Sequence, residues 1–193
     1  MTDALSIGLF VGGAGKRMGG VAKGLLAVPG GGQTIIERLL QVCVRAAPNA
    51  NVFLVGNAAP YASLGLLSLT DDPAGIGPLG GLRSLLLRAR AVGGSALALA
   101  CDLPFLDESV ISLLCAPLKG AARVPVSDGR LQPLAAAYAP EATLAAVERS
   151  LAAGKHSLMH VLEQLSGAVE QVSFDAAAAR ALRDWDCPED LED

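Results

Sequence analysis

A glycine-rich stretch that carries several basic residues stands near the start of the chain. Residues 8–26 read GLFVGGAGKRMGGVAKGLL, and Lys16, Arg17 and Lys23 supply positive charge among the glycines. Consecutive glycines let backbone N–H groups converge on an anion because no Cβ atoms intervene. The residue types and their spacing therefore predict a binding site for a polyphosphate.

Two well-known phosphate-binding loops do not fit this stretch. A P-loop, GxxxxGK[ST], would require glycine at Phe10 and a hydroxyl residue at Arg17. The dinucleotide fingerprint GxGxxG fails because Met18 stands in place of its last glycine. A glycine-rich connection in an ordinary α/β domain remains the simplest alternative, so other residues have to decide.

Acidic residues follow two further apolar runs. The segment TDDPAGIGPLGG, residues 70–81, places Asp71 and Asp72 before a second loop of glycine and proline. The segment LALACDLPFL, residues 97–106, places Asp102 directly after an apolar run. This aspartate could cap a turn, but in a cleft facing a triphosphate it is well suited to bind Mg²⁺.

The elements that must position these residues alternate between strands and helices. Apolar runs bounded by turn residues predict strands at 5–11, 51–55, 66–69, 96–100 and 121–126. Helical spacing predicts helices at 34–47, 78–91, 107–118, 140–153 and 156–165. The first helix is expected to bury Ile35, Ile36, Leu39, Leu40 and Cys43.

This alternation predicts an α/β sandwich with a mostly parallel sheet, because parallel neighbours need a crossover connection. Ligands of such sheets bind beyond the carboxyl ends of the strands, which is where the glycine-rich stretch begins. The segment at about 121–140 is less regular, and its sequence SDGRLQPLAAAY favours a hairpin-like excursion near the substrate.

Composition excludes several classes of protein. The 193 residues fit one domain, and a net charge of −4 argues against general nucleic-acid binding. The 4 cysteines have no CxxC spacing, so neither a zinc site nor a disulfide framework is expected. No apolar run reaches the roughly 18 residues of a membrane helix, and the N-terminus does not fit a signal peptide. We therefore expect a cytoplasmic protein.

Several motifs together resemble those of a known family. GGAGKRMGGVAK resembles the GGxSxRMGxxK signature of nucleotidyltransferases, which transfer NMP from an NTP and have an α/β sandwich fold. DDPAGIGPLGGL, ALACDLPFL and RLQPLAAAY are similar to segments of the molybdenum cofactor guanylyltransferases. The resemblance runs from about residue 5 to the C-terminus. It implies a three-layer α/β/α sandwich with a Rossmann-like sheet of the nucleotide-diphospho-sugar transferase type.

The resemblance also implies roles for individual residues. It assigns Lys23 to the phosphates, Asp102 to Mg²⁺, Asn57 to the base side, and catalysis to Lys23, Arg17 and Asp102. Asp71 fits the acidic nucleotide-binding position, although Asp72 could take that part because the loop length varies. The full nucleotide site implied in this way comprises Phe10, Val11, Gly12, Gly13, Lys23, Asn57, Asp71, Gly77, Pro78 and Asp102.

The reaction implied is transfer of GMP from GTP to the terminal phosphate of molybdopterin, with release of pyrophosphate. A phosphate nucleophile is already anionic near neutral pH because its second pKa is about 6, so no general base is required. Proteins of molybdenum cofactor biosynthesis and molybdoenzymes are the implied partners that receive the product. Arg83 is a further candidate for contact with the pterin phosphate.

Departures from the family pattern leave alternatives open. Val11 replaces the usual alanine, and Asp184 and Asp186 make the C-terminal segment similar to that of related cytidylyltransferases. A CTP-dependent enzyme is therefore one alternative. A relative that acts on a sugar phosphate, or a silent nucleotide-binding module in cofactor delivery, are others.

Two other groups could in principle do chemistry. His156 and His160 have the spacing of a metal pair on one helix face, but no third ligand is evident and an ordinary helix is expected. Cys101 has no histidine partner in the local sequence, so we expect a small buried residue rather than a nucleophile.

Overall fold

A mixed sheet of eight strands lies at the centre of the computed structural model, which describes residues 4–12, 22–28, 32–174 and 180–183. The strands are β1 (Leu5–Phe10), β2 (Asn51–Val55), β3 (Leu67–Leu69), β4 (Ser95–Ala100), β5 (Ala122–Ser127), β6 (Arg130–Leu131), β7 (Ala135–Tyr138) and β8 (Val169–Ser173). Their order is β3-β2-β1-β4-β7-β5-β6, and β8 pairs with β5.

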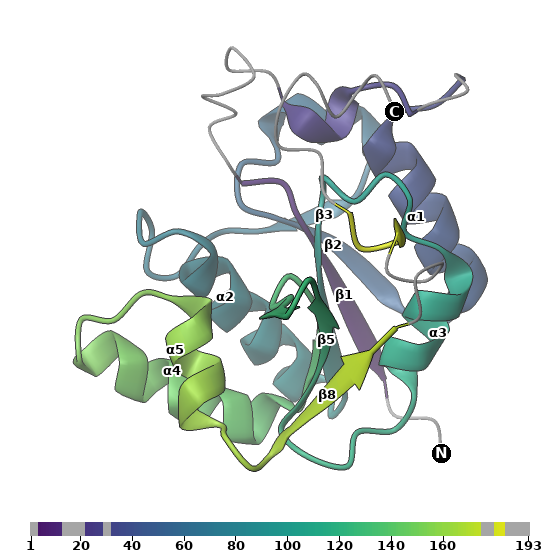
Figure 1. The fold of residues 1–193 in the computed structure, drawn as a ribbon. Coiled ribbons are helices and arrows are strands. Elements are labelled where there is room, and N and C mark those ends of the chain that lie inside the picture. The colour runs from purple at the N-terminus through teal and green to yellow at the C-terminus, as the bar shows by residue number, and fades with distance from the viewer. Residues whose placement is uncertain (1–3, 13–21, 29–31, 175–179, 184–193) are drawn as a thin grey trace.

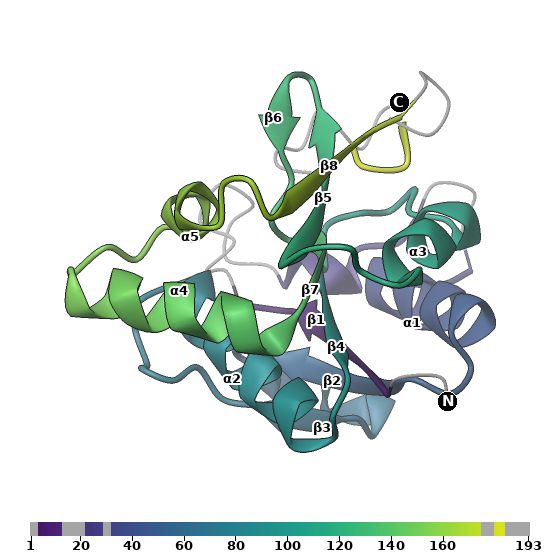
Figure 2. The same cartoon turned by 90° about the horizontal axis from the view of Figure 1, so that it is seen from below.

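Helices cover both faces of this sheet. They are α1 (Ile35–Ala46), α2 (Pro78–Ala91), α3 (Glu108–Cys115), α4 (Pro140–Ala152) and α5 (Leu158–Gln164), with short 3₁₀ segments η2 (Lys23–Leu25) and η3 (Ala59–Leu64). Figures 1 and 2 show α1 and α3 on one face, and α2, α4 and α5 on the other. The predicted three-layer sandwich is confirmed.

The two faces of the central strands carry side chains of different size. On β4, Leu97 and Leu99 belong to the core beneath α1 and α3, whereas Ala96 and Ala98 face α2. On β1, a Cβ atom at Gly8 would lie 2.7 Å from Leu85 Cδ2. Small residues on this face therefore let α2 pack closely against the sheet, which fixes where its N-terminus lies.

The parallel part of the sheet contains β3, β2, β1 and β4. Beyond β4 the pairing is mixed, because β7 is antiparallel to both β4 and β5, while β8 is parallel to β5. The expected hairpin is present as β5 and β6, whose turn places Asp128 and Gly129 at φ values of 50° and 72°. Asp-Gly suits a turn that requires two positive φ angles.

Sequence periodicity failed to predict β7 and β8. The run AAAY in β7 has little intrinsic β-propensity, and β8 reads VEQVS with each residue at least partly exposed. Helix α1 has the expected buried face, except that Leu40 is partly exposed and Val42 is buried. Its start is fixed by a capping box between Thr34 and Glu37.

The carboxyl ends of β1, β2 and β4 lie together at one edge of the sheet. Backbone hydrogen bonds extend the pairing past the strands, from Val11 N to Val55 O at 2.9 Å and from Cys101 N to Phe10 O at 3.2 Å. The first residues after β1 and β4 are therefore held beside the ends of the neighbouring strands. Among the described helices, none combines the length and apolar character needed to span a bilayer.

Candidate functional site

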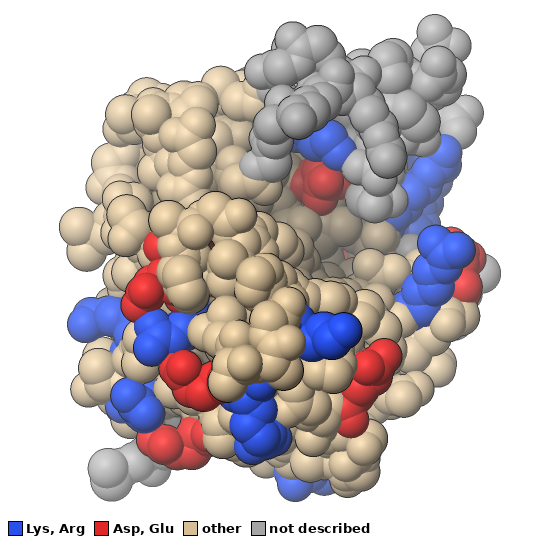
Figure 3. Space-filling view, turned by 90° about the vertical axis from the view of Figure 1, so that its left-hand side faces the viewer, with Lys and Arg blue, Asp and Glu red and all other residues tan. Residues whose placement is uncertain are grey.

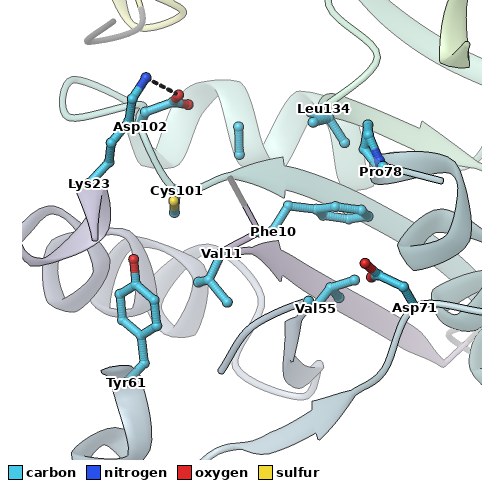
Figure 4. Close-up of a pocket in the computed structure, with 14 residues that line it drawn as sticks. Phe10, Val11, Lys23, Val55, Tyr61, Asp71, Pro78, Cys101, Asp102 and Leu134 are labelled. Carbon is cyan, nitrogen blue, oxygen red and sulfur yellow. Dashed lines mark hydrogen bonds and ion pairs between the residues drawn. The ribbon is translucent and has the colours of Figure 1, made fainter. Parts of the chain in front are cut away.

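A pocket of about 340 Å³ opens at this edge of the sheet. Its volume lies within the range of small-molecule sites. Figure 4 shows that its lining comes from the ends of the central strands, the start of α2 and the η2 segment. The lining residues are Phe10, Val11, Gly12, Lys23, Val55, Gly56, Tyr61, Asp71, Gly77, Pro78, Ala100, Cys101, Asp102 and Leu134.

Most of the residues predicted for the nucleotide site meet in this pocket. Those that line it are Phe10, Val11, Gly12, Lys23, Asp71, Gly77, Pro78 and Asp102. Gly13 and Arg17 lie outside the described residues, as do Lys16, Asp184 and Asp186. Segments far apart in the sequence are thus brought to one place by the sheet edge.

An ion pair lies at one side of the pocket. Lys23 Nζ and Asp102 Oδ2 are 3.3 Å apart, and their side chains are 19% and 22% exposed. Lys23 comes from η2 and Asp102 follows β4, so the pair joins η2 to the segment that follows β4. An ammonium and a carboxylate placed together can bind a phosphate and its counter-cation, respectively.

A second carboxylate occupies the other side of the pocket (Figure 4). Burial raises the pKa of Asp71, and no cation or hydrogen-bond donor among the described residues pairs with this carboxylate. A Cβ atom at Gly81 would lie only 3.0 Å from Asp71 Oδ1, and one at Gly80 would lie 3.2 Å from Asp71 Cβ. The two glycines of α2 therefore create the space that Asp71 occupies.

Asn57 does not line the pocket. It is exposed, and its Oδ1 accepts a hydrogen bond from Ala59 N at 3.4 Å. The residue from the end of β2 that reaches the pocket is the buried Val55, followed by Gly56. The role of Asn57 at the base therefore stays a prediction that the lining of this pocket does not support.

Sequence reasoning missed Tyr61. This residue is only 1% exposed, and its hydroxyl accepts a hydrogen bond from Gly24 N at 3.2 Å. The signal was present, because tyrosine is rare in this chain and Tyr61 follows the second predicted strand by six residues, counting from Val55. No rule of spacing connects it to Gly24, which is 37 residues away in sequence.

The cysteine beside Asp102 has the character expected of it. Cys101 is buried, and burial is the main cause that raises the pKa of its thiol to about 11. A thiol with such a pKa is protonated at neutral pH and is a poor nucleophile. Cys101 thus serves as a small lining residue.

A second hollow adjoins the pocket. The two share Pro78, Ala100, Asp102 and Leu134, and the second hollow has a volume of about 460 Å³. Its remaining lining residues include Gln132 and Pro133 of the sequence QPL, and Leu103, Ala135, His156, Ser157, Leu158 and Met159. Asp102 therefore lines both of these neighbouring spaces.

Acidic and basic side chains are mixed on the face of the molecule shown in Figure 3. Figure 3 shows one face with a hollow where acidic and basic side chains meet, and with both signs of charge mixed over the rest of that face. The described lysines and arginines visible on this face form no continuous stripe of the kind that binds nucleic acid.

Arg83 does not line either space. Its Nε donates to Glu148 Oε1 at 2.7 Å, and its Nη1 is paired with Asp72 Oδ2. In this structure two carboxylates hold the guanidinium, and contact of Arg83 with a substrate phosphate stays a prediction. The pairing joins α2 to α4 and to the loop that carries Asp72.

The two histidines do not form a metal pair on a helix. His156 is exposed and precedes α5, whereas His160 lies within it. In the part of the chain that the structure describes, no group of three or more His, Cys, Asp or Glu residues could hold a metal ion. Mg²⁺ commonly binds through one carboxylate and substrate phosphates, so Asp102 does not need such a cluster to be a cation ligand.

Comparisons with known proteins match this chain to one family. A model described as the MobA-like NTP transferase domain matches residues 9–184. Molybdenum cofactor guanylyltransferase of Cereibacter sphaeroides is 35% identical over 130 residues, which are 65% of this chain and 64% of that protein. The corresponding enzyme of Acidiphilium cryptum is 34% identical over 142 residues, covering 72% and 69% of the two chains. The chain thus matches slightly less than two thirds of the first relative's length.

Solved structures share the fold. Molybdopterin-guanine dinucleotide biosynthesis protein A from Archaeoglobus fulgidus has a TM-score of 0.75 and 23% identity, covering 97% of this chain and 95% of that one. A 2-C-methyl-D-erythritol 4-phosphate cytidylyltransferase from Thermus thermophilus has a TM-score of 0.65 and 21% identity, covering 100% and 96%. Because the family model matches most of the sequence, the chain belongs to the family of MobA-like NTP transferase domains.

Proposed function

We propose that this protein transfers GMP from GTP to the terminal phosphate of molybdopterin, which releases pyrophosphate and forms a guanine dinucleotide cofactor. Membership of the family and the names of its relatives support the reaction class. The two adjoining spaces that share Asp102 support a reaction between two substrates.

The observation that carries the choice of GTP is the Asp71 carboxylate, which lines the pocket without a protein partner among the described residues. Guanine presents two neighbouring donors, N1–H and the 2-amino group, and an ionised carboxylate can accept from both. Cytosine presents an acceptor, N3, beside its amino group, and this acceptor would face the negative charge. A carboxylate that gains two donors is stabilised more than one that faces an acceptor, so Asp71 favours guanine.

The phosphates belong at the opposite side of the pocket. The Lys23 ammonium would contact the phosphate oxygens, and the backbone at Gly12 would let them approach closely. Gly13 and Arg17, which lie outside the described residues, are proposed to extend this cradle. Fixed positive charge stabilises the charge that develops on the α-phosphoryl group and on the leaving pyrophosphate.

A magnesium ion fits the chemistry of Asp102. The carboxylate offers a hard oxygen ligand and the substrates would supply the others, which is how Mg²⁺ is commonly bound. Held there, the ion would neutralise phosphate charge. The residues of the chain hold the two substrates in line, so that an oxygen of the acceptor phosphate bonds to the α-phosphorus while the bond to the β-phosphate breaks.

The second hollow is the proposed place for the acceptor. It contains Gln132 and Ser157, which can donate hydrogen bonds, and apolar side chains such as Leu158 against which a pterin can pack. The acceptor phosphate would then lie beside Asp102, where both spaces meet. Such a reaction belongs in the cytoplasm, and cofactor-biosynthesis proteins or molybdoenzymes would receive the product.

Product analysis tests the proposal. The purified protein is incubated with Mg²⁺, molybdopterin and either GTP or CTP, and nucleotide-linked pterin and pyrophosphate are measured by mass spectrometry and a coupled assay. We expect product with GTP. Product with CTP instead would assign the protein to the cytidylyl branch, and tight GTP binding without any product would assign it to the silent binding modules.

A further inference from the structure

The backbone next to Lys23 is held by a side chain from another part of the fold. Gly24 N donates a hydrogen bond of 3.2 Å to the hydroxyl of Tyr61, which is contributed by η3 after β2. Figure 4 shows the Tyr61 hydroxyl pointing toward the part of the pocket occupied by Cys101 and Lys23. The contact therefore links η2 to the segment that follows β2.

Tyr61 is well fixed and can serve as an anchor. Its side chain is 1% exposed and belongs to the core cluster beneath α1 and α3. A Cβ atom at Gly24 would lie 3.0 Å from both Tyr61 Cε1 and the hydroxyl, and 3.3 Å from Ile36 Cβ. Glycine thus allows the backbone to approach the phenol closely enough for the hydrogen bond.

The hydroxyl is neutral throughout the working pH range. Burial is the main cause that raises the pKa of Tyr61 above its ordinary value, and the nearby negative charge of Asp102 also contributes. A neutral phenol can accept from Gly24 N and retain its own proton to donate. Its hold on η2 therefore does not depend on pH.

We propose that Tyr61 is a positioning residue, whose hydroxyl fixes the backbone at Gly24 so that the Lys23 ammonium is directed at Asp102 and at a bound polyphosphate. Lys23 is adjacent to Gly24, and its ammonium is 3.3 Å from Asp102 Oδ2. A lysine side chain has four rotatable bonds, so a fixed backbone limits where its charge can lie. This inference rests on the proposed function in one respect, namely that the pocket binds a polyphosphate.

Calorimetric titration with Mg²⁺ and inorganic tripolyphosphate tests this role on the full chain. Tyr61→Phe keeps the ring and removes the hydroxyl, and we expect it to weaken tripolyphosphate binding by about fivefold to tenfold, as the loss of one buried hydrogen bond does. Lys23→Met removes the charge that Tyr61 is proposed to direct. In a Lys23→Met background, Tyr61→Phe should change the affinity by less than about twofold, because coupled residues are not additive.

Three outcomes of this titration would overturn the inference. One is an equal effect of Tyr61→Phe in both backgrounds, since a general loss of structure does not depend on Lys23. The others are unchanged binding in Tyr61→Phe, and no tripolyphosphate binding by the unaltered protein. Tripolyphosphate has neither base nor acceptor, so binding and coupling can be found even if the proposed choice of GTP or molybdopterin is wrong.

Tyr138→Phe is the matched control. Tyr138 is the second of the 2 tyrosines, is also 1% exposed, and donates its hydroxyl to Pro133 O at 2.7 Å. The same atom is removed and a hydrogen bond is lost, but not one that holds η2. We expect Tyr138→Phe to leave tripolyphosphate affinity unchanged. A loss equal to that of Tyr61→Phe would indicate a general effect of destabilisation and contradict the role of Tyr61.

Discussion

At the scale of residues, Lys23 and Asp102 carry opposite charges and form an ion pair at one side of the pocket. In this structure the ammonium and the carboxylate are 3.3 Å apart. A triphosphate with its counter-cation offers each a new partner, because phosphate oxygens attract the ammonium and the cation attracts the carboxylate. Substrate binding is therefore expected to exchange the ion pair for two interactions of the same type.

Asp102→Asn should abolish most transfer without unfolding the protein. The substitution keeps the size of the side chain but removes its negative charge, so the counter-cation of the nucleotide loses its protein ligand. We expect kcat to fall by roughly 10²–10³-fold, the size of effect seen when one electrostatic contact to a transition state is removed. Asp128→Asn, in the exposed turn between β5 and β6, is the control and should retain full activity. Near-normal turnover in Asp102→Asn would contradict the assigned role.

Asp71→Asn should weaken GTP binding without lowering stability. Burial raises the pKa of this carboxyl, so the folded protein is stabilised by Asp71 being protonated, and that stability is lost as the pH rises through the raised pKa. At neutral pH the wild-type carboxylate is charged, and asparagine removes a desolvated charge. We expect Tm to stay equal or to rise, and the affinity for GTP to fall by about 10- to 100-fold. Calorimetry and thermal unfolding check both.

The same carboxylate predicts a pH dependence of binding. Only ionised Asp71 can accept from both donors of guanine, so GTP affinity should rise with pH through the raised pKa of Asp71. ITP lacks the 2-amino group and should therefore bind the wild type more weakly than GTP does. In Asp71→Asn, ITP and GTP should bind with about the same affinity. A GTP preference that persists in Asp71→Asn would place recognition of the base elsewhere.

At the scale of elements, α2 packs closely against the part of the pocket that contains Val55 and Asp71. A Cβ atom at Gly81 would lie 2.6 Å from Val55 Cγ1 and 3.0 Å from Asp71 Oδ1. Alanine is ordinarily the better helix former by about 1 kcal/mol, yet at this position it has no space. The packing of one helix residue thus determines both the wall at Val55 and the place of Asp71.

Gly81→Ala should destabilise the protein by about 1–3 kcal/mol, because overpacking costs more than helix propensity returns. It should also weaken GTP binding more than its effect on Tm explains, since Asp71 must move. Urea denaturation and calorimetry measure the two effects. Arg90→Ala, at an exposed position of the same helix, is the control and should change stability by less than about 0.5 kcal/mol. A stabilised Gly81→Ala variant would refute the packing argument.

A buried arginine joins the end of α3 to strands β5 and β8. The guanidinium of Arg123, on β5, donates to the carbonyl oxygens of Leu113, Leu114, Ala116 and Pro117 at 2.6–3.4 Å. Its Nη2 is 3.0 Å from Glu170 Oε2 on β8, and its side chain is 5% exposed. One side chain therefore satisfies the C-terminal carbonyls of α3 and ties them to two strands.

Arg123→Met should cost roughly 3 kcal/mol of stability or more, because several carbonyl oxygens lose their donor at once. The midpoint of urea unfolding measures this loss, and Arg130→Met at an exposed position of β6 should leave it nearly unchanged. Arg123 does not line the pocket, so nucleotide affinity at low temperature should be retained. An equal effect of the two substitutions would show that Arg123 contributes no more than a surface residue.

At the scale of the whole molecule, hydrophobic periodicity together with turn and capping residues predicted the bounds of most strands and helices. Strands such as LSIGLF and SALALA, and helices with caps such as Thr34 and Asp107, lie close to their expected bounds. The meeting of Lys23, Asp71 and Asp102 was also predictable, because the carboxyl ends of parallel strands share one edge.

Other features could not be read from one chain. The alanine-rich β7 is stabilised by its neighbours rather than by its own propensity, so its tertiary contacts decide its state. Asn57, which lies outside the pocket, is two residues from Val55, which lines it, and spacing alone could not fix which of these residues reaches the pocket. The Tyr61 contact with Gly24 depends on tertiary packing between distant segments.

We propose that the pocket at the sheet edge selects GTP together with a divalent cation. Calorimetric titration of one preparation of the protein with GTP, CTP and ATP, with and without Mg²⁺, tests this selectivity. We expect the tightest binding for GTP and a clear loss of affinity when Mg²⁺ is removed. Tighter binding of CTP, or binding that is the same for all three nucleotides, would contradict the assignment of Asp71 to guanine.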